Sequence, residues 1–216
     1  MLESENVRQL LLTCHRRPRR LYNYNMQKSA LFVAFLFASL CAFGQNTWTL
    51  DKGHSKIGFT VTHHMISEVD GYFKDYEGKM TATREDYSDA VFELTVQTAS
   101  LNTNLEMRDG HLKSPDIFDV EKFPTMTFKS TAFNQIAGNR YKMTGDLTIK
   151  GATLPITLDV TMVGPGKNER AKRFEMGVKA LGKLSRLAFG VGKNLGTTSV
   201  GDEVELRILG EFDKAY

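Results

Sequence analysis

Apolar side chains recur at every second position through most of the chain that follows Trp48. A period of two places apolar groups on one face of a strand and leaves the other face to Lys, Thr, Glu, Gln and Asp. Apart from a short segment near Ser114, no comparable stretch keeps a helical period. The pattern predicts about eight one-sided strands, in runs that include Ile57/Phe59/Val61, Phe92/Leu94/Val96, Met126/Phe128, Tyr141/Met143/Leu147/Ile149, Leu154/Ile156/Leu158/Val160/Met162, Phe174/Met176/Val178 and Val204/Leu206/Ile208.

Turn signals separate these runs, among them Asp70-Gly71, Gly138-Asn139 and Lys150-Gly151. Connections this short join antiparallel neighbours, because parallel pairs need long crossovers. The result is either a closed up-and-down barrel or a sandwich. Closure removes exposed edges, and an eight-stranded barrel holds its own side chains or one slim ligand. The alternation alone leaves the two architectures open.

Residues 108–121 interrupt the alternation and are expected to form a short helical cap over one end of the β structure. Ser114 is a candidate N-cap, Pro115 suits the first helical turn, and Asp116 favours the positive end of the helix dipole. Pro124 restricts the preceding residue to an extended conformation and ends the segment. The segment also carries apolar side chains that must be buried: Ile117, Phe118 and Phe123.

The same cap carries a cluster of charged and imidazole groups. An acid/base site is one interpretation of this cluster. Nothing at a fixed spacing supplies a nucleophile or an oxyanion hole, and no Gly-x-Ser-x-Gly is present. We therefore favour a polar network that holds the cap in place, with an arginine paired to a carboxylate, and we do not expect an enzyme. The predicted members of this network are Arg108, Asp109, His111, Asp116 and Asp119.

His63 and His64 resemble a pair of metal ligands. Adjacent side chains on a regular strand point to opposite faces, so His63 is expected to point inward at the mouth of the barrel and His64 outward. An inward His63 could bond a ligand head group, or it could bond the backbone or an acid. His54, His63 and His111 could still converge in space. With no HExxH motif and no recognisable ligand spacing, we expect no metal site.

The segment 180–198 is rich in glycine and only weakly periodic. We expect it to form a mobile loop or a rim, where function often resides. A phosphate-binding loop is the alternative, but the Gly-x-x-x-x-Gly-Lys-[Ser/Thr] pattern is missing.

Residues 26–44 have the features of a secretory signal peptide. Lys28 supplies the positive charge, an apolar run follows, and Ala42 and Gly44 are the small residues of a cleavage site. The run is too short to span ~30 Å of hydrocarbon comfortably. We expect export to the periplasm or the medium, with cleavage after Gly44.

Residues 1–25 precede a plausible initiator methionine, and we interpret them as a start codon assigned too early rather than as a basic functional arm. Up to residue 44 the chain has 6 Lys+Arg and 2 Asp+Glu, so residues 45–216 carry 28 − 6 = 22 basic and 25 − 2 = 23 acidic residues. This balance removes the main support for nucleic-acid binding. Both cysteines, Cys14 and Cys41, also precede residue 45, so one domain over 45–216 must be held together by its core.

Several spaced motifs occur in a fixed order between Trp48 and the C-terminus. In residue types, spacing and order they closely resemble the motifs of the YceI-like family. The resemblance implies an extended, lipocalin-like antiparallel β-barrel that binds a long apolar lipid of the isoprenoid type in the bacterial periplasm, and a homodimer. The motifs are Asp51-x-x-His54-Ser55, Gly71-x-Phe73, Ala99-Ser-x-x-Thr103, Arg108-Asp-x-His111-Leu-Lys-Ser-x-Asp116-x-Phe118-Asp119, Phe123-Pro124-x-x-x-Phe128-x-Ser130, Gly145-x-Leu147-Thr-Ile149-x-Gly151, Arg186-x-x-Phe189-Gly190 and Val200-Gly-Asp202-x-Val204.

A carrier of an amphipathic lipid is therefore the leading hypothesis. Inward aromatic and Met side chains are soft enough to line a tunnel around a flexible chain. The cargo could be an isoprenoid quinone, a polyprenyl lipid or a fatty-acid-like lipid, with transient contact to a membrane or to lipid-using enzymes. Two alternatives remain: an enzyme that uses the His/Asp cluster, and a barrel packed solid that acts through its surface. The expected tunnel residues are Ile57, Phe59, Val61, His63, Phe92, Leu94, Val96, Phe118, Phe128, Leu147, Ile149, Ile156, Leu158, Phe174, Met176 and Phe189.

Overall fold

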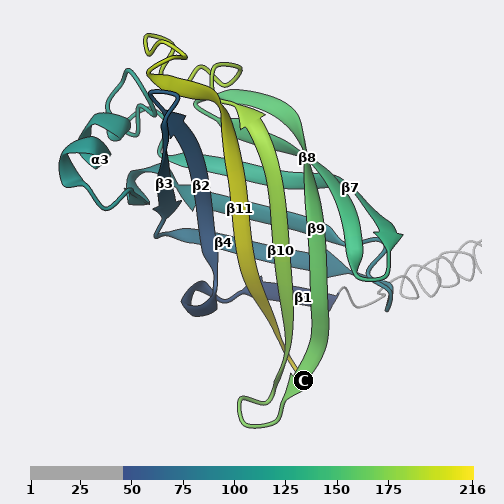
Figure 1. Cartoon of the computed structure of the whole chain (residues 1–216). Helices are drawn as coiled ribbons and strands as arrows, with labels where there is room; N and C mark the ends of the chain where they lie inside the picture. The colour runs from purple at the N-terminus through teal and green to yellow at the C-terminus, as the bar shows by residue number, and fades with distance from the viewer. Residues whose placement is uncertain (1–45) are drawn as a thin grey trace, which may run out of the picture. The chain divides into compact units, whose positions relative to one another are not determined.

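The computed structural model describes residues 46–216, and the predicted extension and signal peptide lie outside this range. Its elements are β1 (Asn46–Leu50), η2 (Lys52–His54), β2 (Lys56–His63), β3 (Ser67–Phe73), β4 (Tyr76–Ala82), β5 (Val91–Gln97), η3 (Thr98–Ser100), β6 (Leu101–Asn102), α3 (Glu106–Lys113), β7 (Thr125–Ala137), β8 (Arg140–Ile149), β9 (Ala152–Asn168), β10 (Arg173–Ser185) and β11 (Val200–Ala215). The predicted all-β architecture with one short helix is confirmed (Figure 1).

The strands close into an antiparallel barrel. β1, β4, β5, β7, β8, β9, β10 and β11 follow one another in hydrogen-bonded order, and β11 returns to β1 to complete the ring of eight. A sandwich, the other architecture that the alternation allows, is thereby excluded. Closure leaves no free edge around this ring, which is the advantage that the sequence pattern indicated.

β11 closes the barrel with two partners along its length. Near the end of β11, Asp213 lies opposite Thr49 of β1. Near the beginning of β11, Val204 lies opposite Val61 of β2. β2 then pairs with β3, and β3 pairs with the short β6. At this end of the barrel the sheet order stops at β6, so among the described strands none joins β6 to β7. The chain between β6 and β7, which contains α3, lies at this end.

Breaks in three neighbouring strands separate β2, β3 and β6 from the ring of eight. The 3-10 turn η2 separates β1 from β2, two residues separate β3 from β4, and η3 separates β5 from β6. The side chain of Asp51 caps η2 by accepting from the Gly53 N–H at 2.7 Å. The breaks are tied together, because the Gln97 N–H donates to the Asp75 carbonyl at 2.9 Å and the Tyr76 hydroxyl donates to the Ser55 carbonyl.

The alternation decides which side chains enter the barrel, and the inner positions divide into two regions. Trp48, Met80, Met176 and Val160 are almost fully buried and pack solidly toward the β1 end. On β8 and β9 the buried residues fall at every second position, as the pattern predicted. Toward the α3 end many inward side chains are only partly covered, among them Phe59.

The helix of the cap lies before the position that the sequence predicted. Ser114 was the expected N-cap, but α3 ends at Lys113 and Ser114 is its C-cap, with φ −64° and ψ 162°. Pro115 explains the difference, because the residue before a proline is disfavoured in the helical region. Turns follow over 115–118, and Ile117 is buried. Among residues 46–216, no helix is long and apolar enough to cross a membrane.

Candidate functional site

A cavity of about 450 Å³ lies inside the barrel. Its volume falls within the range of small-molecule binding sites, and most of its wall is aliphatic or aromatic. Every side chain predicted to line a tunnel lies on this wall, except Phe174 and Met176.

Phe174 and Met176 lie on the expected face of β10, but at a level along the barrel axis that the cavity does not reach. Met176 is 1% exposed and belongs to the packed region, opposite Phe212 in the register. The ring of Phe174 packs against Tyr216, with 5.1 Å between centroids, beyond the cavity. Alternation fixes the face of a strand, whereas the level along the barrel depends on pairing with distant strands.

Two glycines let large rings lie directly against the wall. A Cβ atom at Gly145 would lie 2.4 Å from Cζ of Phe128, and one at Gly71 would lie 2.2 Å from Cζ of Phe59. Neither glycine could become alanine without moving its ring toward the centre of the barrel. The missing side chains therefore help to keep the cavity open.

The segment 186–199 closes one part of the cavity around a buried arginine. Arg186 is 5% exposed, and its five guanidinium N–H groups all reach backbone carbonyls at 2.6–3.0 Å. Phe189, Val191 and Leu195 contribute apolar side chains to the wall. The acceptors of the guanidinium are the carbonyls of Val191, Gly192, Leu195, Val200 and Gly201.

The expected rim over 180–198 is therefore only partly correct. Residues 180–185 continue β10, and a Cβ at Gly182 would lie 2.4 Å from Leu158 on the neighbouring strand. That glycine marks a close approach between strands and not a turn. Arg186 and the apolar residues of the rim were not predicted as a unit, although the Arg186-x-x-Phe189 motif was the signal that could have found them.

The cap network contains a threonine at its centre. Arg108 donates from Nε to the Thr103 hydroxyl and from Nη2 to the Thr103 carbonyl, both at 2.8 Å. Asp109 accepts from the Thr103 N–H at 2.8 Å and from its hydroxyl at 2.5 Å. The predicted pairing of Arg108 with a carboxylate is wrong, because the buried Thr103 stands between the two charges.

His111, Asp116 and Asp119 do not join this network. No side-chain hydrogen bond within residues 46–216 involves any of the three; His111 lies on the cavity wall and Asp116 is exposed. Asp119 has φ +52° and acts through its backbone: its N–H donates to the Ser114 carbonyl and its carbonyl accepts from the Phe123 N–H, both at 2.8 Å.

Donors from the barrel hold the rest of the cap. The Lys150 ammonium donates to the carbonyls of Pro115 and Ile117, each at 2.8 Å. The Thr98 hydroxyl donates to the Phe123 carbonyl at 3.0 Å. These donors bind backbone carbonyls of the cap and not its charged side chains. A pattern of charged residues in the sequence therefore could not predict them.

The two adjacent histidines lie close together, contrary to the prediction. β2 ends at His63, and His64 and Met65 have φ of +50° and +62°. With the strand interrupted, the two imidazole rings meet at 4.1 Å between centroids. His63 and His111 both reach the cavity wall, but the length of β2, roughly 30 Å of extended chain with its flanks, separates His54 from them. The three histidines do not converge.

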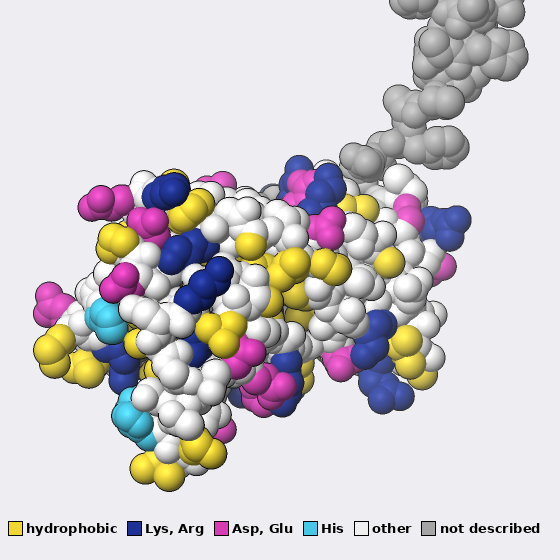
Figure 2. Space-filling view, turned by 90° about the horizontal axis from the view of Figure 1, so that it is seen from above, with side chains coloured by type: hydrophobic (Ala, Val, Ile, Leu, Met, Phe, Trp, Pro, Cys, Tyr) yellow, Lys and Arg dark blue, Asp and Glu magenta, His cyan; other side chains and the backbone are white. Residues whose placement is uncertain are grey.

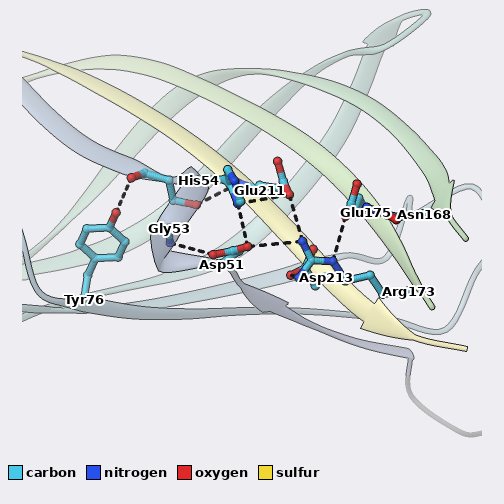
Figure 3. Close-up of polar contacts among 10 residues, drawn as sticks. Asp51, Gly53, His54, Tyr76, Asn168, Arg173, Glu175, Glu211 and Asp213 are labelled. Carbon is cyan, nitrogen blue, oxygen red and sulfur yellow. Dashed lines mark hydrogen bonds and ion pairs between the residues drawn. The ribbon is translucent and has the colours of Figure 1, made fainter. Parts of the chain in front are cut away.

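His54 belongs instead to a polar cluster around Arg173 on the outside of the barrel (Figure 3). Arg173 pairs with Asp213 and with Glu175, both at 2.8 Å. Its Nη2 also lies 3.6 Å from Asp51 and 3.8 Å from Glu211. One guanidinium thus joins the corner that follows β1 to β10 and β11.

Hydrogen bonding and burial shift the pKa values in this cluster. The hydrogen bond between His54 and Asp51, at 2.9 Å, raises the pKa of the imidazole and lowers that of the carboxyl. Burial raises the pKa of Asp213, against the opposing effect of Arg173. Asp51/His54/Glu211 and Glu175/Glu211/Asp213 are spaced closely enough to hold a cation, but Arg173 already supplies positive charge among these carboxylates.

Comparison with known proteins identifies the fold and the family. The model of the YceI-like domain matches residues 48–212. Protein YceI of Escherichia coli O157:H7 is 32% identical over 85% of this chain and 96% of its own length. The crystal structure of BcnA from Burkholderia cenocepacia superposes with a TM-score of 0.67 at 26% identity, covering 75% of this chain and 98% of that one. A polyisoprenoid binding domain from Saccharophagus degradans, at 12% identity, shares the fold with a TM-score of 0.55 over 77% of this chain and 98% of that one.

Arg186→Met tests the role of the guanidinium in the rim. Buried carbonyls that lose their donors cost about 1–3 kcal/mol each, so we expect a loss of about 3 kcal/mol or more in the free energy of unfolding. Arg207→Met removes an exposed arginine from β11 and should change stability by less than about 0.5 kcal/mol. Urea denaturation measures both variants. Equal midpoints for the two would contradict the assigned role.

The pair His54–Asp51 makes the stability of the barrel depend on pH. The folded-state pKa of His54 lies above 6.5, so its contribution is complete below pH 6.5 and is lost as the pH rises through the raised value. The difference in free energy of unfolding between wild type and His54→Ala should therefore shrink with rising pH. In an Asp51→Asn background the same comparison should lose most of its pH dependence. A difference that grows with pH would show that the sign is wrong.

Proposed function

This chain belongs to the YceI-like family, and we propose that its barrel binds a lipid with a long apolar tail and carries it outside the cytoplasm. The observation that carries this proposal is the apolar cavity of about 450 Å³ inside a closed barrel. A barrel packed solid, one of the alternatives from the sequence, does not agree with that cavity.

Burial of the tail supplies enough free energy for binding without a specific head-group site. Each CH₂ group removed from water contributes about 0.8 kcal/mol, so a tail of about fifteen carbons gives on the order of 10 kcal/mol before the costs of ordering and association. Flexible and aromatic side chains on the wall, such as Met143, Phe59 and Phe128, can adapt to a bent chain.

The isoprenoid class is the favoured cargo. The Saccharophagus degradans domain that shares this fold is described as polyisoprenoid binding. An isoprenoid quinone, a polyprenyl lipid or a fatty-acid-like lipid would each place its apolar chain against the same wall. We carry this property over from that domain as a proposal for the present chain.

Binding and not catalysis is the activity that the family and the cavity support. Two of the acids of the cap that the sequence offers for acid/base chemistry have other roles: Asp109 accepts two hydrogen bonds from Thr103, and Asp119 holds a turn through its backbone. The proposal also includes export, which rests on the apolar leader over 26–44, and a homodimer, which rests on the family resemblance.

Val61→Trp or Val96→Trp tests the cavity as a binding site. Both valines lie on the wall, so a bulkier side chain should fill space that the lipid occupies. We expect loss of co-purifying lipid, measured by native mass spectrometry, with the melting temperature nearly unchanged. Overpacking a solid core would instead cost about 1–3 kcal/mol of stability.

Thr60→Trp is the matched control on the same strand. Its side chain faces outward, where the hydroxyl bonds Asp70 at 2.6 Å, so lipid content should stay close to that of wild type. Loss of lipid in Thr60→Trp together with unfolding of Val61→Trp would overturn the proposed binding site.

Export predicts a defined N-terminus. If the leader is removed after Gly44, intact-mass measurement of protein recovered from the periplasm or the medium should begin at Gln45. A cytoplasmic product that retains the leader would refute this part of the proposal.

A further inference from the structure

Large apolar side chains stand exposed on two segments at the cap end of the barrel. Met65 and Ile66, in the turn between β2 and β3, are 72% and 88% exposed. Leu105 and Met107, at the start of α3, are 47% and 81% exposed. Figure 2 shows hydrophobic, basic, acidic and histidine side chains together at the left end of the view. A single exposed apolar residue is ordinary, but such a group marks an interaction surface.

The mouth of the cavity lies between these two segments. His63, at the end of β2, and His111, on α3, both line the cavity and are both exposed at the surface. The cavity therefore reaches solvent where β2 ends beside α3. Met65 and Ile66 directly follow His63, and Leu105 and Met107 precede His111, so the exposed apolar side chains belong to the two segments that carry these histidines.

The backbone holds the turn in a conformation that displays its apolar residues. His64 and Met65 adopt left-handed φ values, which are uncommon for residues other than glycine. The Ile66 N–H donates to the His63 carbonyl at 3.2 Å, and the Ser67 hydroxyl reaches the same carbonyl at 3.3 Å. The turn is thus closed on itself, with Met65 and Ile66 directed away from the core.

The polar groups at the mouth are complementary to phosphate. The polar side chains of β2 and α3 on the cavity wall are His63, Arg108 and His111, each a nitrogen base. Lys113 adds a cation at the end of α3, and the acid Asp109 is buried and accepts hydrogen bonds from Thr103. The exposed acids of these segments are Glu106 on α3, Glu68 at the start of β3 and Asp116 after the helix, and none of the three lines the cavity. Basic groups face the opening while apolar side chains project beyond it, an arrangement that suits the interface of an anionic bilayer.

We propose that this end of the barrel docks on the surface of a phospholipid bilayer, with Met65, Ile66, Leu105 and Met107 inserted among the lipids. The proposal rests on the lipid-binding function proposed above. Docking brings the mouth of the cavity against the membrane, so a tail passes between bilayer and barrel without exposure to water. The imidazole and guanidinium groups at the opening then lie at the level of the phosphates.

Sedimentation with vesicles of phosphatidylcholine and phosphatidylglycerol tests the docking surface. The double variant Ile66→Ser/Met107→Ser removes two of the inserted side chains and should lower the partition onto vesicles at least about tenfold. Vesicles of phosphatidylcholine alone should bind the wild-type protein more weakly, because they lack the net negative charge.

Ile136→Ser/Val163→Ser is the matched control. These residues are 60% and 66% exposed but lie on β7 and β9 outside the cavity wall, so vesicle binding should equal that of wild type. An equal loss in both double variants, or no loss in Ile66→Ser/Met107→Ser, would overturn the proposal. So would sedimentation velocity showing that Ile66→Ser/Met107→Ser dissociates a dimer, since a second copy would then be the occupant.

Native mass spectrometry separates docking from cargo binding. If Ile66→Ser/Met107→Ser keeps its lipid and loses only the vesicle interaction, the docking surface is supported. If the wild-type protein sediments with vesicles but never contains lipid, the proposed cargo fails while the docking surface stands.

Discussion

The pairing of β11 with both β1 and β2 is the constraint on which the rest of the structure depends. Its last residues complete the ring of eight strands, and its first residues carry a separate flap of β2, β3 and β6. One strand can serve two partners only if the partner chain bends between them. The 3-10 turn capped by Asp51 provides that bend, and neighbouring strands break beside it. A fully regular barrel would have no opening for a cap.

This split explains why one half of the barrel is solid and the other is hollow. Around Trp48, Met80 and Met176 the ring is closed, and its inward side chains meet across the interior. Toward the flap the wall is widened, and rings such as Phe128 lie against a glycine instead of reaching the centre. The packed half can hold the fold while the hollow half accepts a ligand. Stability and binding are therefore placed on different stretches of the same strands.

The strands and most of the cavity wall could be predicted from the sequence, because alternation reports directly which face of a strand is buried. The level of a residue along the barrel axis could not, and for this reason the alternation places Met176 on the cavity wall although it lies in the packed core. The sequence predicts the cap but not the direction of its helix from Ser114, because the restraint that Pro115 places on Ser114 outweighs the N-cap preference of serine. The role of Arg186 could not be predicted because its hydrogen-bond partners are backbone carbonyls, which every residue carries. Side-chain patterns cannot identify such acceptors.

Hydrogen bonds to backbone carbonyls also hold the rim and the cap in place beside the basic side chains at the mouth of the cavity. Arg186 and Lys150 fix the rim and the cap by donating to neutral backbone oxygens, and within residues 46–216 neither cation pairs with a carboxylate. The acids that also hold these segments are satisfied by local donors: Asp109 is buried and accepts from Thr103, and Asp202 accepts from the Leu187 N–H and the Ser185 hydroxyl. Buried hydrogen bonds to carbonyls are also less sensitive to salt than exposed ion pairs. The groups that anchor the rim and the cap are thus different from the exposed apolar side chains such as Ile66, so substitution of Ile66 leaves these anchors intact.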